Sequence, residues 1–96
     1  MVILYKSPFK KFVKKQNRAF QLAIEDEAEY IKNSPEIGET KKGDLSDILI
    51  HKFDFQRQGY LMAYKLQKDH ITYYMIGTHE NFYRELKCYI KEVDQT

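Results

Sequence analysis

The spacing of apolar residues changes from a helical period to a strand period near residue 47, and this change constrains the fold most strongly. Earlier in the chain, apolar residues recur three or four positions apart, which is typical of amphipathic helices. They are Phe9, Phe12, Val13, Phe20, Ala23, Ile24, Ala28 and Ile31. From Ile48 to Phe55 the side chains instead sort onto two faces with period two, as in a strand. The two periods together predict an α+β fold.

Local signals divide the first half of the chain. The run from Val2 to Lys6 predicts a short strand, and Ser7-Pro8 favours a helix start. Asn17 separates two helical stretches, and Pro35 ends the second because it disfavours helix in the residue before it. We therefore predict two antiparallel helices within residues 8–33, followed by a loop over residues 34–46.

The second half predicts an antiparallel meander and a last helix. Strands are expected at 48–55, 60–66 and 71–76, with a turn at 56–59 in which Gly59 adopts the unusual dihedral angle. After Gly77, a final helix is expected, with Phe82, Leu86, Tyr89, Ile90 and Val93 along one face. The predicted order is β-α-α-β-β-β-α in one domain, residues 1–96. The helical hairpin must pack on one face of the sheet. The other face, or the concave side of the twisted meander, is then available for a ligand.

Composition excludes several classes of protein. Aromatic residues make up 15% of the 96 residues, too many for a disordered chain. No apolar run approaches the roughly 20 residues of a membrane span, and no secretory signal follows Met1, so a cytoplasmic location is expected. A single cysteine, Cys88, excludes an internal disulfide and a thiolate zinc cluster. We expect a buried Cys88 thiol, no metal and no cofactor.

A net charge of +2 hides a strong segregation of charge. Residues 1–20 contain no acid and six cations, namely Lys6, Lys10, Lys11, Lys14, Lys15 and Arg18. Residues 25–39 contain six acids and one cation, Lys32. The basic segment is either a solvated helix face or a surface that attracts phosphate-rich or acidic partners.

The chain resembles the RelE/ParE superfamily of bacterial toxins over residues 3–93. The resemblance rests on the order of elements, the loop at 38–43 and the segment GYLMAY at 59–64. In addition, IGTHENFY at 76–83 is similar to the G-[TS]-H-x-x-[LF]-[FY] ending of the YafQ-like members. The resemblance implies a RelE-like, microbial ribonuclease-type fold.

The resemblance also implies a toxin that a cognate antitoxin protein neutralises. RelE-like and YafQ-like members cleave messenger RNA on the ribosome, whereas ParE-like members inhibit DNA gyrase. A third alternative is a degenerate relative that only binds its antitoxin. We favour a ribosome-dependent, metal-independent mRNA endonuclease, and keep the other two as alternatives.

His79 is the leading candidate for proton transfer. It matches the catalytic histidine of the YafQ-like ending, and an unperturbed histidine titrates near working pH. The alternative is a local hydrogen bond near the helix start. Tyr83 and Arg84 follow it and are expected to stack on a base and to pair with a phosphate.

His51 and Lys52 are competing candidates. His51 lies where YafQ-like toxins carry another functional histidine, but its face also contains Phe53 and Phe55, so a partly buried core histidine is an equal alternative. Lys52 lies where RelE carries a catalytic lysine. Neighbouring strand residues point to opposite sides, so at most one of them is expected to line the site. Asp54 and Leu61 replace a lysine and an arginine of RelE, which favours the histidine branch and also motivates the degenerate alternative.

Other cations are expected to contact the ribosomal or messenger backbone, where charge adds affinity without sequence information. They are Lys10, Lys11, Lys14, Lys15, Lys41, Lys42 and Arg57.

Overall fold

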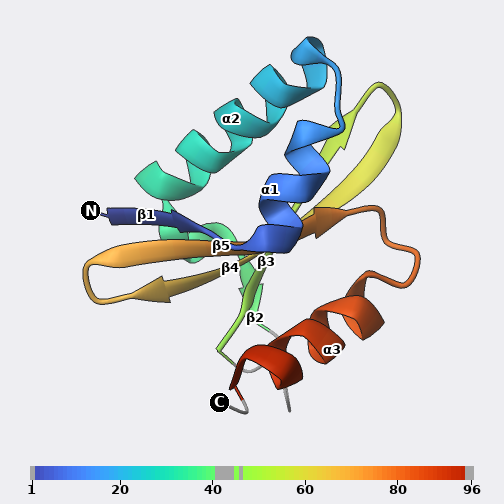
Figure 1. Cartoon of the computed structure of the whole chain (residues 1–96). Coiled ribbons are helices and arrows are strands. Elements are labelled where there is room, and N and C mark those ends of the chain that lie inside the picture. Colours follow the sequence, from blue (N-terminus) through green and yellow to red (C-terminus); the bar gives the residue numbers. More distant parts are fainter. Residues whose placement is uncertain (1, 41–44, 46, 95–96) are drawn as a thin grey trace.

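The structure is a computed structural model that describes residues 2–40, 45 and 47–94. It contains a five-stranded mixed sheet, three α-helices and one 3-10 helix (Figure 1). The strands are β1 (Val2–Tyr5), β2 (Glu39–Thr40), β3 (Leu49–Phe55), β4 (Gln58–Gln67) and β5 (His70–Gly77). The helices are α1 (Ser7–Lys14), α2 (Arg18–Asn33), η1 (Pro35–Ile37) and α3 (Phe82–Asp94). The α+β class is confirmed.

The strand order in the sheet is β1-β5-β4-β3-β2. The predicted meander of β3, β4 and β5 is present and antiparallel. β1 pairs in parallel with β5, from Val2 opposite His70 to Tyr5 opposite Tyr73, so α1 and α2 form part of the crossover between them. β2 and η1 lie in the segment that the sequence predicted as a loop. Each has only two or three residues, too few to show a period.

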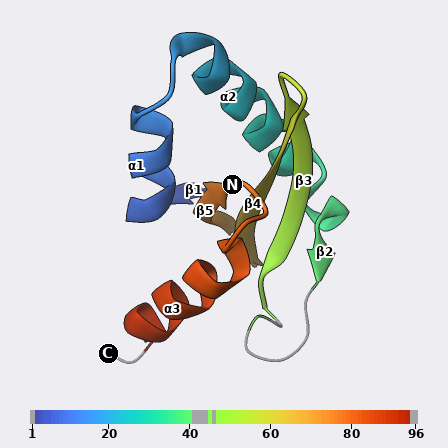
Figure 2. The same cartoon turned by 90° about the vertical axis from the view of Figure 1, so that its right-hand side faces the viewer.

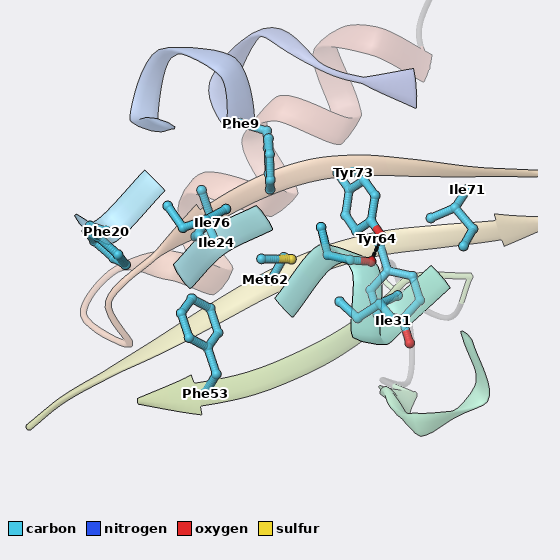
Figure 3. Close-up of a cluster of buried hydrophobic side chains, with 11 residues drawn as sticks. Phe9, Phe20, Ile24, Ile31, Phe53, Met62, Tyr64, Ile71, Tyr73 and Ile76 are labelled. Carbon is cyan, nitrogen blue, oxygen red and sulfur yellow. Dashed lines mark hydrogen bonds between the residues drawn. The ribbon is translucent and has the colours of Figure 1, made fainter. Parts of the chain in front are cut away.

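Two hydrophobic cores lie on opposite faces of the sheet. On one face, α1 and α2 cover alternate residues of the strands, as predicted (Figure 3). The helix α3 lies apart from α1 and α2 (Figure 1 and Figure 2). On the other face of the sheet, its residues Phe82 and Leu86 pack with Leu61 and Met75. Strict alternation breaks in β5 because a bulge shifts its register against Ala63 and Tyr64 of β4.

The helix boundaries follow from local chemistry. The Oδ1 atom of Asn17 accepts a hydrogen bond from the backbone N–H of Phe20 at 2.9 Å, which caps α2. In α1, Ser7 is the first helical residue and Lys6 occupies the cap position. The Cys88 thiol is exposed, so the prediction of a buried thiol is wrong. Cys88 lies two residues after the buried Leu86, a rotation of about 200° around the helix.

Two buried tyrosines join the sheet to α2 and to the turn after it. The Tyr64 hydroxyl donates to the carbonyl of Pro35 at 2.5 Å and accepts from the Gly38 N–H at 3.0 Å. The Tyr73 hydroxyl donates to the carbonyl of Ala28 at 2.7 Å. Burial raises the pKa of both tyrosines above the ordinary value. A side chain at Gly38 would place its Cβ 2.5 Å from the Tyr64 oxygen, so this position needs glycine.

The turn between β3 and β4 differs from the prediction. Its two central residues are Gln56 and Arg57, with φ angles of 49° and 68°. Gly59 lies inside β4 instead, paired with Asp54. The prediction that glycine takes the unusual dihedral angle is therefore wrong, because two ordinary side chains adopt left-handed conformations at the tip.

Candidate functional site

A depression of about 420 Å³ lies beside the β3–β4 hairpin, along the second half of β3 and the first half of β4. It is bounded by residues from β3 and β4 and by the segment that follows β5. These residues are Lys52, Phe53, Asp54, Gln58, Gly59, Tyr60, Leu61 and His79.

The strand register explains why these side chains meet. Lys52 pairs with Leu61, which in turn pairs with Gly77 of β5, two residues before His79. Asp54 pairs with Gly59, and a Cβ atom at Gly59 would contact the Asp54 Oδ1 at 3.5 Å. The missing side chain therefore leaves open space beside the Asp54 carboxylate. Lys52 and Asp54 of β3, Leu61 of β4 and His79 after β5 therefore border one depression.

His79 is held by the turn that starts α3. Its carbonyl accepts a hydrogen bond from the Phe82 N–H at 3.3 Å, and Asn81 takes a left-handed φ of 62°. Asparagine tolerates this conformation better than most residues. The exposed His79 ring meets the Tyr83 ring edge to face, with centroids 5.7 Å apart. The structure thus brings two of the predicted site residues together.

Lys52 and His51 project to opposite sides of β3, as predicted. The exposed Lys52 lines the depression, and its Nζ lies 3.5 Å from Glu39 Oε2. His51 lies under α2, where its Nε2 atom is 2.7 Å from Glu27 Oε1 and its side chain is only 11% exposed. His51 also stacks on Phe53. Lys52 therefore shares the depression with His79, whereas His51 does not.

The remaining predicted cations that the structure describes are not among the residues that line the depression. Arg84 is exposed in the first turn of α3, and Arg57 is exposed at the hairpin tip, next to Gln58. The four α1-region lysines, Lys10, Lys11, Lys14 and Lys15, are exposed on the helical-hairpin side of the sheet. Lys41 and Lys42 lie outside the described residues.

Sequence reasoning did not assign Asp54, Gln58 or Leu61 to the site. Asp54 had a usable signal, because it follows Lys52 by two in a strand and must share its face. Gln58 and Leu61 depend on the register between β3 and β4, which the incorrect turn assignment obscured. Within the described residues, no three histidine, cysteine or acidic side chains are grouped so as to hold a metal ion.

Comparison with known proteins identifies the family. Residues 3–87 match the family described as ParE-like toxins of type II bacterial toxin–antitoxin systems. The chain therefore belongs to this family. Among curated proteins, no sequence matches the chain.

Two solved structures share the fold. A chain of the intact RelBE toxin–antitoxin complex of E. coli aligns with a TM-score of 0.64 at 16% identity, covering 82% of this chain and 96% of that one. The isolated RelE toxin of E. coli aligns with a TM-score of 0.63 at 17% identity, covering 98% of this chain and 96% of that one. No helix in the described residues is both long and apolar enough to cross a membrane.

Proposed function

We propose that this protein is a toxin that blocks translation by cutting messenger RNA on the ribosome. The observation that carries the proposal is the shared depression of His79 and Lys52, with Tyr83 against the histidine ring. RNA cleavage without a metal needs a base for the 2′-hydroxyl, an acid for the leaving 5′-oxygen and a cation at the phosphate. The site offers candidates for these roles.

His79 serves as one of the two proton-transfer groups. Lys52 supplies positive charge to the non-bridging phosphate oxygens, and the Tyr83 ring, in contact with His79, offers a surface for base stacking. Arg84, one residue further along α3, adds a second cation near the messenger backbone. The α1 lysines lie on the helical-hairpin side of the sheet, so they contact ribosomal RNA rather than the scissile phosphate.

The protein partner in this proposal is a cognate antitoxin in the cytoplasm. The support comes from the family, whose members belong to toxin–antitoxin systems, and from the RelBE complex, which has the same fold in one of its chains. The antitoxin holds the toxin inactive until it is removed.

The test is addition of purified protein to a translating extract, followed by primer extension on a reporter message. The wild-type protein should produce codon-phased cuts. His79→Ala should reduce the cleavage rate by about 10²–10⁴-fold, the usual contribution of one acid–base group. His70→Ala is the matched control, because His70 contacts Asp69 at the start of β5 and does not line the depression.

Cleavage that is unaffected by His79→Ala would refute this mechanism. Absence of cuts together with inhibition of gyrase supercoiling would instead establish a ParE-like activity. A protein that neither cuts nor inhibits gyrase, and does not arrest growth when induced without antitoxin, would be a non-catalytic relative.

A further inference from the structure

Asp54 is the one acidic side chain among the described residues that line the depression. It is exposed, and within the described part of the chain no hydrogen bond or ion pair engages its carboxylate. Gly59 lies directly across the strand pair, and a Cβ atom there would lie 3.5 Å from the Asp54 Oδ1. On the outer side, β2 pairs with β3 only at Leu49 and Ile50, so no described strand lies beside Asp54 there. The carboxylate is therefore open to a ligand from both sides.

Charge decides which part of a nucleotide this carboxylate faces. A carboxylate repels a phosphate, whereas the Lys52 ammonium attracts one. Lys52 and Asp54 project from the same face of β3, two residues or about 7 Å apart. In the proposed function the scissile phosphate lies at Lys52, so Asp54 faces an uncharged part of the nucleotide. Because Gly59 carries no side chain, there is room for a planar base beside the Asp54 carboxylate.

We propose that Asp54 is a specificity-determining residue that reads one base of the cleaved codon and selects guanine. This inference rests on the proposed function. An ionised carboxylate only accepts hydrogen bonds. Guanine is the one RNA base whose Watson–Crick edge carries two adjacent N–H donors, at N1 and N2. Adenine, cytosine and uracil each place an acceptor beside the donor on that edge, and the carboxylate repels such an acceptor.

The rest of the depression suits an unpaired base. Proteins that read single-stranded RNA hydrogen-bond the Watson–Crick edge of a base and stack its face on aromatic rings. His79 lines the depression, and its ring contacts the Tyr83 ring with centroids 5.7 Å apart. An aromatic pair and a carboxylate in one site can hold a base by its face and by its edge. A bidentate contact of this kind discriminates against the wrong base by about 10–100-fold.

The test uses messages that differ at one base. Each position of the cleaved codon is changed in turn to guanine, adenine, cytosine, uracil or inosine. Inosine keeps the N1–H of guanine and lacks its 2-amino group, so it forms only one of the two hydrogen bonds. Cleavage is measured in a single turnover on programmed ribosomes with the wild type, Asp54→Asn and Asp26→Asn. Asp26, exposed on α2, is the matched control.

At one codon position, the wild type should cut the guanine message about 10–100-fold faster than the adenine, cytosine and uracil messages, with inosine in between. Asp54→Asn should cut all five within about threefold of one another, because an amide has one donor and one acceptor and can pair with every base edge. On adenine, cytosine and uracil it should be at least as fast as the wild type. Asp26→Asn should match the wild type throughout. Thermal unfolding verifies that each variant is folded, which is expected because both side chains are exposed.

Three results would overturn the inference and leave the proposed function intact. Equal cleavage of every message by the wild type would show that no base is read. A guanine preference that Asp54→Asn retains would assign the preference to a group other than Asp54. Loss of rate by the same factor on every message in Asp54→Asn would show that Asp54 does not act through the base. Failure of the wild type to cut any message would instead refute the proposed function itself.

Discussion

Removal of the Tyr64 hydroxyl should destabilise the protein, because this hydroxyl links the sheet to the turn after α2 by hydrogen bonds. Tyr64→Phe keeps the buried ring and deletes one oxygen. That oxygen now donates to the Pro35 carbonyl at 2.5 Å and accepts from the Gly38 N–H at 3.0 Å. The substitution leaves both backbone groups without their present partner, next to a side chain that has no exposed surface.

The size of the effect follows from these two hydrogen bonds. Each contributes about 0.5–1.5 kcal/mol net, and an unpaired buried backbone group costs about 1–3 kcal/mol. The turn at residues 35–38 is only partly buried, so water can reach one of the two groups. We therefore expect a loss of about 2 kcal/mol in the free energy of unfolding. For a domain of this size that corresponds to a fall in Tm on the order of 10 °C.

Urea denaturation gives the loss in stability, and amide hydrogen exchange reports the mechanism. The Gly38 N–H should exchange faster in Tyr64→Phe, because its acceptor is gone. Tyr30→Phe is the matched control: Tyr30 is 54% exposed, and its hydroxyl forms no hydrogen bond within the described residues. The control should change stability by less than about 0.5 kcal/mol. A Tyr64→Phe variant as stable as Tyr30→Phe, with unchanged Gly38 exchange, would refute the reasoning.

Two further predictions concern pH and the hairpin tip. Burial raises the pKa of Tyr73 and Tyr64, so unfolded tyrosines lose protons near pH 10 while the folded ones keep them. The contribution of these two tyrosines to the free energy of unfolding is therefore fully present below about pH 10. Above that pH, the free energy of unfolding falls by up to about 1.4 kcal/mol per pH unit per tyrosine. Urea titrations at several pH values should show a shallower fall for Tyr73→Phe. At the tip, Gln56→Asn with Arg57→Gly should raise the unfolding free energy by about 1 kcal/mol, because asparagine and glycine accept positive φ. An unchanged urea midpoint would show that the tip is not strained.

The sequence predicted the elements that have a clear spacing of apolar residues or that are bounded by a capping residue or a proline. The Asn17 cap and Pro35 fixed the ends of α2, and alternation located β3. Parallel pairing of β1 with β5 was not predicted, because a four-residue strand carries no signal that identifies its partner. The predicted turn at 56–59 contains the observed tip, but the general preference for glycine at positive φ pointed to Gly59, whereas the positive φ angles are at Gln56 and Arg57.

In the candidate site too, relations between neighbouring residues were predictable, whereas contacts between distant parts of the chain were not. Alternation along β3 correctly separated His51 from Lys52, because this relation depends only on neighbouring residues. The sequence could not decide which of the two lines the site, because that depends on how the helices pack on the sheet. In the structure, His51 lies under α2 and contacts Glu27, whereas Lys52 lines the same depression as His79. The same alternation places Asp54 in the depression, because it lies two residues after Lys52 in the strand and faces the same side.

The positions of the α1 lysines and of the depression indicate how large a target the toxin contacts in the proposed function. The α1 lysines belong to the helical hairpin, whose residues pack on one face of the sheet, whereas α3 packs on the other. Leu61, which lines the depression, packs in the core under α3, so the depression is on the α3 side. The molecule measures 35 × 29 × 22 Å. In the proposed function, a ribonucleoprotein body that surrounds the toxin contacts both regions, the depression through the message and the α1 lysines through ribosomal RNA.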